Sequence, residues 1–156
     1  MKHFTNSVNS HIIPVNTMYI FLSSFSGSID KKNRISIPSS YKKTIKNSKQ
    51  KIYLFKSLKN NCLEIYLEEK INSIINSVEE EDFFSTKKDD LRTAILSDLE
   101  EISFDSDGRF ILKDDQKKFS KISKDIIYIG KGNYFEIWDF KMGIKNKERA
   151  RKSIIK

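Results

Sequence analysis

The sequence has one cysteine, Cys62, and two histidines, His3 and His11, among its 156 residues. A lone cysteine cannot form a disulfide within the chain, which fits a reducing compartment. A structural zinc site needs four cysteine and histidine ligands, and a serine or cysteine nucleophile needs a base beside it. We therefore predict no catalytic residue, no metal ligand and no cofactor.

Long apolar stretches are also missing. The longest strongly apolar run, residues 18–22, is too short to span a bilayer. It also makes a poor signal peptide, because no longer apolar core or small-residue cleavage site accompanies it. The sequence therefore predicts a cytoplasmic protein with no membrane partner.

Glycine and proline are scarce, with five and two residues, whereas Phe and Tyr number 11 and 6. These aromatic side chains can build a core even though hydrophobic residues make up only 38% of the chain, which argues against full disorder. A chain of this length is expected to form one compact domain or two small, closely packed halves.

Residues 1–17 hold one Lys, no acid and several Asn, Ser and Thr. We interpret them as a disordered lead-in, with a first strand at 12–15 as the alternative.

The charge is positive overall and unevenly spread. The formal net charge is +8 and the pI about 9.4, which favours a polyanionic partner without naming it. Residues 30–56 hold nine bases and one acid, residues 79–101 nine acids and three bases, and residues 144–156 six bases and one acid. A basic face attracts phosphate, and an acidic face of one subunit can meet a basic face of the next. Ordinary solvated faces are the alternative.

An internal repeat organises the chain. Asp105 follows Asp30 by 75 positions, and Arg109 follows Arg34 by the same interval. The interval persists for apolar segments and then falls to 72, because the second copy has a shorter loop. The matched segments are 28–30 with 103–105, 52–54 with 127–129 and, at the shorter interval, 64–66 with 136–138. A repeat this long indicates two copies of one supersecondary unit.

Each copy predicts the same order of elements: a strand, a tight turn, a second strand, a short Lys-rich helix or turn, and two more strands. The second strand alternates apolar residues, Ile35 and Ile37 in one copy and Phe110 and Leu112 in the other. The other expected strands are 25–30, 51–56 and 62–67 in the first copy and 102–105, 126–129 and 134–138 in the second.

Helical patterns separate and follow the copies. Ile71, Ile74, Ile75 and Val78 recur at the spacing of one helix face. Thr86 followed by Asp89 is typical of a helix start, and an apolar face continues to residue 99. Residues 142–155 predict a basic helix. The expected organisation is therefore a lead-in at 1–17, a first repeat at 18–70, connecting helices at 71–99, a second repeat at 100–143 and a basic segment at 144–156.

The two D-x-x-x-R turns are the candidate functional site. Their fourth positions, Asn33 and Gly108, are the residue types that best tolerate a left-handed backbone. The opening Asp can accept hydrogen bonds from backbone N–H groups two residues on, and the closing Arg can donate a bidentate pair to guanine or phosphate. The alternative is that Asp and Arg merely pair with each other, which duplication within a longer repeat makes less favoured. The predicted DNA-contacting residues are Asp30, Lys31, Lys32, Asn33, Arg34, Asp105, Gly108 and Arg109.

Four segments in order, GSIDKKNRISIPSSYKK, LEIYLEEK, SFDSDGRFIL and IYIGKGNYFEIW, resemble the MraZ family of SpoVT-AbrB-type DNA-binding transcriptional regulators. The resemblance spans about residues 21–143. It implies an α+β fold, a pseudo-twofold double-split β-barrel of interleaved strands built from two tandem repeats, with helices packed on one side. It further implies a ring-shaped homo-oligomer, nucleoid-associated, that binds short direct repeats in double-stranded DNA upstream of the cell-division and cell-wall gene cluster, usually as a repressor.

This sequence departs from the family pattern at three positions. Asn33 replaces the usual glycine of the first turn. Lys113 stands where Pro38 follows the equivalent strand, and Gln116 stands opposite Tyr41 at a position that is usually apolar. The helix of the second copy is therefore expected to pack differently.

Two other interpretations stay open from sequence. A non-catalytic assembly module would also carry basic and acidic faces that join subunits. An RNA-binding protein would carry the same basic excess.

Overall fold

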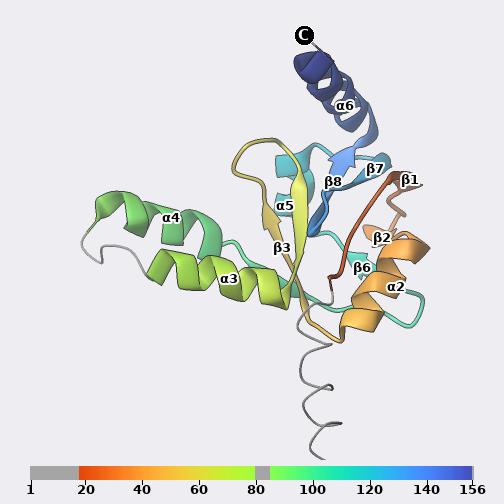
Figure 1. The fold of residues 1–156 in the computed structure, drawn as a ribbon. Coiled ribbons are helices and arrows are strands. Elements are labelled where there is room, and N and C mark those ends of the chain that lie inside the picture. Colours follow the sequence, from red (N-terminus) through yellow and green to blue (C-terminus); the bar gives the residue numbers. More distant parts are fainter. Residues whose placement is uncertain (1–17, 80–84, 156) are drawn as a thin grey trace, which may run out of the picture.

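The computed structural model describes residues 18–79 and 85–155 (Figure 1). The expected lead-in at 1–17, and the alternative strand within it, lie outside the described residues. The elements in chain order are β1 (Ser24–Ser28), β2 (Arg34–Ser36), α2 (Ser39–Ser48), β3 (Ile52–Lys56), β4 (Leu63–Leu67), α3 (Glu68–Glu79), α4 (Thr86–Leu96), β5 (Glu100–Ile102), β6 (Arg109–Ile111), α5 (Asp114–Ser120), β7 (Asp125–Gly130), β8 (Tyr134–Asp139) and α6 (Phe140–Ile155).

Six strands form one antiparallel sheet in the order β1-β7-β8-β4-β3-β5. Exchanging the two repeats replaces β1 by β5, β3 by β7 and β4 by β8, which reproduces the same order backwards. The sheet therefore has a pseudo-twofold axis between β4 and β8. The copies are interleaved, because the first strand of each repeat pairs with the other repeat: β1 with β7, and β5 with β3.

A glutamate pair marks the axis. Glu64 of β4 and Glu136 of β8 are direct cross-strand partners, and the second follows the first by 72 positions. Both side chains are buried. The repeat detected in the sequence is therefore a symmetry of the folded sheet.

The second strands of the two repeats form a separate two-stranded ribbon. β2 and β6 pair antiparallel, with Ile35 opposite Phe110 at the centre. Both central side chains are buried and belong to the main core, which the inner face of the sheet completes. Because side chains alternate along a strand, the flanking residues of the ribbon face the other way.

The helices that follow the ribbon strands start differently. α2 follows Pro38, which has no backbone N–H to satisfy. α5 follows Lys113, whose backbone N–H donates to the Gln116 side chain at 2.9 Å. This explains why a polar residue is buried at position 116: its carbonyl oxygen caps the helix. The N-terminus of α5 is accordingly held by a contact that α2 lacks.

Helices α3 and α6 cover the outer face of the sheet. Ile71, Ile74 and Ile75 of α3 pack with Phe55 and Tyr66, while α6 contributes three side chains to a cluster around Trp138. Those three are Phe140, Met142 and Ile144. Beyond its first turns α6 extends away from the sheet, and α4 lies against α3 on another side of the molecule (Figure 1). Within residues 18–79 and 85–155, no helix is long and apolar enough to cross a bilayer.

The α+β class and the predicted order of strands and helices are confirmed. One finer expectation, the closed barrel, is not confirmed, and another differs from what is observed. The backbone ladders of the described residues form an open sheet and a separate ribbon, not one closed barrel. The helices also lie on both faces, because Tyr41 and Ile45 of α2 join the inner core while α3 and α6 cover the outer face.

Candidate nucleic-acid interface

The first turn is closed by its aspartate. Asp30 Oδ1 accepts hydrogen bonds from the backbone N–H groups of Lys32 at 2.8 Å and Arg34 at 2.9 Å. Asp30 Oδ2 accepts a third from Arg34 Nε at 2.7 Å. Asn33 has a φ of 62°, so the predicted left-handed position is confirmed.

The second turn repeats this geometry. Asp105 Oδ1 accepts from the backbone N–H groups of Asp107 and Arg109, both at 2.9 Å, and Oδ2 accepts from Arg109 Nε at 3.0 Å. Gly108 has a φ of 74°. One contact has no counterpart in the first turn: Arg109 Nη2 also pairs with Asp107 Oδ2 at 3.1 Å. The first turn carries exposed Lys31 and Lys32 instead.

These hydrogen bonds change the titration of both carboxyl groups. The backbone N–H of Arg34, followed by its side chain and the N–H of Lys32, holds the pKa of Asp30 below its usual value of 3.8. The backbone N–H of Arg109, followed by that of Asp107 and the Arg109 side chain, lowers the pKa of Asp105 in the same way. Both aspartates are therefore ionised at neutral pH, and the anionic form is the one that closes the turn.

The geometry shows the alternative that the sequence left open, in which each Asp pairs with its Arg. In the first turn, this pairing leaves the Nη donors of the arginine unused. Each Asp takes the Nε–H of its Arg. Among the described residues, neither Nη atom of Arg34 has a hydrogen-bond partner. Pairing therefore orients the guanidinium without using all of its donors.

The ribbon brings the two arginines onto one face. Arg34 lies opposite Ile111, and Arg109 lies opposite Ser36. The arginines are therefore diagonal neighbours, about 7–8 Å apart between backbones in an antiparallel pair. Ser36 and Ile111 lie between them on the same face, and Ile111 is 63% exposed although apolar. The sequence did not predict these two residues as part of the site, because only the strand pairing places them there.

A second feature that the sequence did not predict is a pair of crossed lysines. Lys117 of α5 donates from Nζ to Asn33 Oδ1 in the other repeat's turn, at 2.8 Å. Its repeat counterpart, Lys42 of α2, lies against Gly108, where an added Cβ would be 2.6 Å from Lys42 Cδ. Each turn is therefore braced by a lysine of the opposite repeat.

Backbone hydrogen bonds also join each turn to the opposite repeat. The N–H of Leu112 donates to the Asn33 carbonyl at 2.8 Å, and the N–H of Ile37 donates to the Gly108 carbonyl at 3.4 Å. All eight residues predicted from sequence lie in the two turns, which the ribbon joins. The two lysines could have been found in the sequence, because Lys42 and Lys117 are 75 positions apart, which is the interval of the repeat.

The described residues include one group with metal-binding side chains, at the pseudo-twofold axis. Ligand atoms of Cys62, Glu64 and Glu136 lie within 4.8 Å of one another. Burial, with the charges of Glu136 and Glu64, raises the pKa of the Cys62 thiol, so that it is protonated at neutral pH, whereas metals bind the thiolate. Tyr66 and Trp138 each donate to one of the two glutamates at 2.9 Å. We interpret the group as a hydrogen-bonded part of the core.

The fold and the turns define a class: α+β proteins of two interleaved repeats that present paired Asp-Arg turns on one ribbon. Residues 20–93 match the family described as "MraZ protein, putative antitoxin-like". The chain is 32% identical over 136 residues to the "Transcriptional regulator MraZ" of Rickettsia akari (strain Hartford), covering 86% of this chain and 91% of that protein. It is 32% identical over 134 residues to the protein of the same name from Pelagibacter ubique (strain HTCC1062), covering 85% and 86%. The chain belongs to the MraZ family, as its motifs predicted.

Proposed function

We propose that this protein is a transcriptional regulator that binds double-stranded DNA through the β2–β6 ribbon and its two turns. Arg34 and Arg109 on one exposed face, each oriented by an aspartate, are the observation that carries the proposal. Membership of a family whose relatives are named transcriptional regulators supports it, and that role involves no catalysis.

The ribbon suits a major groove. The groove admits a two-stranded ribbon, and an arginine there can donate two hydrogen bonds to a guanine edge. The Nη edge of Arg34 is open for this contact, whereas one Nη2–H of Arg109 is already paired with Asp107. Ile111 between them offers an apolar contact to a thymine methyl group.

The lysines around the ribbon contact the DNA phosphates. Lys31 and Lys32 extend from the first turn, and Lys42 and Lys117 flank the ribbon from the two helices. Phosphate contacts set affinity and position, while base contacts set specificity. The first turn therefore contributes more phosphate attraction, and the second acts chiefly through Arg109. Asp30, Asn33, Asp105 and Gly108 maintain the turn geometry.

The larger assembly follows from the small size of this interface. One ribbon offers few base contacts, so several copies on one DNA gain affinity by avidity when subunit spacing matches site spacing. We therefore propose a ring-shaped homo-oligomer on short direct repeats, acting in the nucleoid as a repressor of the cell-division and cell-wall genes. In it, the repeats at 18–70 and 100–143 are the two halves of a double-split barrel made by sheet and ribbon together.

The test is a titration of fluorescent DNA from the region upstream of this gene against a scrambled duplex. Wild type is expected to prefer the upstream DNA, with log K falling by about 0.9 per neutralised phosphate as log salt rises. The double variant Arg34→Ala/Arg109→Ala should lose that preference. Lys141→Ala/Lys152→Ala removes the same charge from α6 and should retain it.

Normal binding by the Arg34→Ala/Arg109→Ala variant would refute the turn interface. Equal binding of upstream and scrambled duplexes by wild type would favour an assembly module. Tighter binding of the RNA version of the same sequence would favour an RNA-binding protein.

A further inference from the structure

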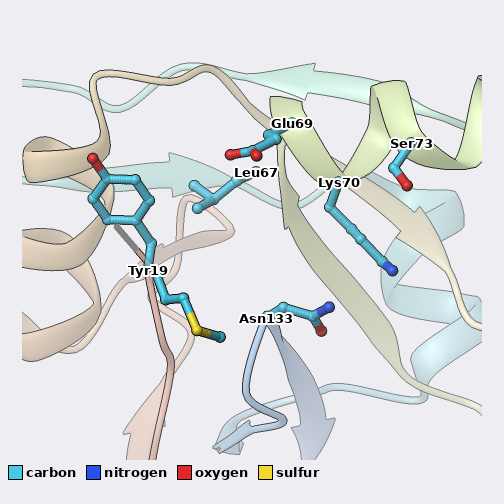
Figure 2. Close-up of a pocket in the computed structure, with 7 residues that line it drawn as sticks. Tyr19, Leu67, Glu69, Lys70, Ser73 and Asn133 are labelled. Atoms are coloured by element: carbon cyan, nitrogen blue, oxygen red, sulfur yellow. The ribbon is translucent and has the colours of Figure 1, made fainter. Parts of the chain in front are cut away.

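Two crevices have linings that are partly related by the pseudo-twofold symmetry. The first lies between the β7–β8 turn and α3 and is lined by Asn133, Lys70 and Ser73, among others (Figure 2). The second lies between the β3–β4 turn and α6. It is lined at the corresponding positions by Asn61, Met142 and Lys145, each 72 positions from its counterpart.

The two crevices differ in the segments that line them. Met18 and Tyr19 from the N-terminal end of the described chain also line the first crevice, beside α3 and Asn133. Figure 2 shows Tyr19 on a third segment, with its ring beside Leu67 and pointing away from Lys70 and Asn133. The lining of the second crevice comes only from the β3–β4 turn, the end of β8 and α6, as far as the described residues show. Among the described residues, no segment lines the second crevice as Met18 and Tyr19 line the first.

The open crevice is basic above an apolar floor. Lys59, Lys145 and Arg149 line it, together with the apolar side chains of Trp138 and Met142. Arg149 is held in place by Asn146, whose Oδ1 accepts from Nη2 at 3.0 Å and from Nε at 3.3 Å. Its described lining contains three cations and no carboxylate. An occupant should therefore combine negative charge with an aromatic or apolar group.

We propose that this crevice binds the acidic-aromatic segment at 79–84 of a second copy of the chain. That segment has the sequence Glu-Glu-Glu-Asp-Phe-Phe, the only place in the chain where four consecutive acids precede two aromatics. The carboxylates pair with the three cations, and a phenylalanine ring packs on Trp138 and Met142, where a sulfur–aromatic contact is favourable.

The partner must be another copy because of where the ends of α3 and α4 lie. The two helices that flank residues 80–84 meet far from α6 (Figure 1). A contact between two different surfaces of identical chains is heterologous, and such contacts generate rings when the rotation closes. The inference rests on the proposed ring and names the surfaces that build it.

The experiment is a charge exchange in the full chain, read by sedimentation velocity at micromolar concentration. Lys145→Glu/Arg149→Glu and Glu80→Lys/Glu81→Lys should each weaken assembly at least tenfold. The chain that carries all four changes should assemble again. Lys141→Glu/Lys152→Glu alters the same helix by the same charge outside the crevice and should assemble like wild type. A synthetic peptide of residues 77–86 should compete with assembly and change the emission of Trp138, the only tryptophan.

Assembly of the Lys145→Glu/Arg149→Glu variant like wild type would overturn the inference, as would a wild-type protein that stays monomeric. Loss of DNA affinity with an intact oligomer would instead make the crevice a nucleic-acid contact and also overturn it. The proposed DNA interface is tested separately, because Arg34→Ala/Arg109→Ala should lose specific binding while keeping the oligomer.

Discussion

Lys117 of the second repeat donates a hydrogen bond from Nζ to Asn33 Oδ1 of the first repeat's turn, at 2.8 Å. Lys42, its counterpart in the first repeat, lies against Gly108 of the second. Backbone hydrogen bonds from Leu112 to Asn33 and from Ile37 to Gly108 likewise join each turn to the other repeat. Each turn is thus shaped by its own aspartate and held in position by the other repeat, so the two arginines are placed as one unit.

Replacing Lys117 by Met should loosen the first turn while preserving the fold. The lost hydrogen bond is partly exposed and is worth about 0.5–1.5 kcal/mol of unfolding free energy. We expect affinity for the upstream duplex to fall more than affinity for scrambled DNA, measured by fluorescence anisotropy. Lys118→Met, at the exposed neighbouring position of α5, removes the same charge and is the control. An equal loss of both affinities in Lys117→Met would show that the residue acts only through its charge.

Gly108 should accept Asn far better than Val. Its φ of 74° is left-handed, and Asn occupies the equivalent position 33 at 62°. A branched residue there costs about 1–2 kcal/mol of strain, whereas Asn costs less because it visits this region readily. An added Cβ also requires the flexible end of Lys42 to move. Urea denaturation of Gly108→Asn and Gly108→Val measures the difference, and equal midpoints would contradict the account.

Gly143→Ala should destabilise the docking of α6. A Cβ at this position would lie 2.9 Å from Trp138 Cβ and nearer still to Ile127 Cγ2, so the helix or the sheet must shift. Overpacking of this kind costs about 1–3 kcal/mol. We expect a lower thermal midpoint and a red shift of Trp138 emission. Ser153→Ala, exposed near the end of the same helix, should leave both unchanged.

Asp30 and Asp105 should titrate below 3.8 in the folded protein, as measured by carboxyl chemical shifts in NMR. Because their pKa values are lowered on folding, the turns gain stability that is present above the unfolded value and lost as pH falls through the folded value. The largest cause is a backbone N–H, which Arg34→Gln retains. That variant should keep most of the lowered pKa of Asp30. A return of the Asp30 pKa to 3.8 would instead assign the effect to the guanidinium.

The periodic features of the fold were predictable because each depends on neighbouring residues in the chain. Alternation at Ile35 and Ile37 predicted β2, and the face at Ile71, Ile74 and Val78 predicted α3. The turn motifs predicted Asn33 and Gly108 as left-handed positions. Gln116 was anomalous in sequence alone, because its role as a helix cap depends on the backbone N–H that Lys113 has and Pro38 lacks.

The sequence by itself determined the two repeats, the positions of the two turns and the left-handed residue in each. These are local, because an aspartate needs only one tight turn to reach the backbone N–H groups two and four residues on. The tertiary structure alone decided that the repeats interleave, that β2 pairs with β6, and that Lys117 and Lys42 cross to the opposite turns. Those contacts join residues about 75 positions apart, and their register is set by burying Ile35 and Phe110 together beneath the ribbon.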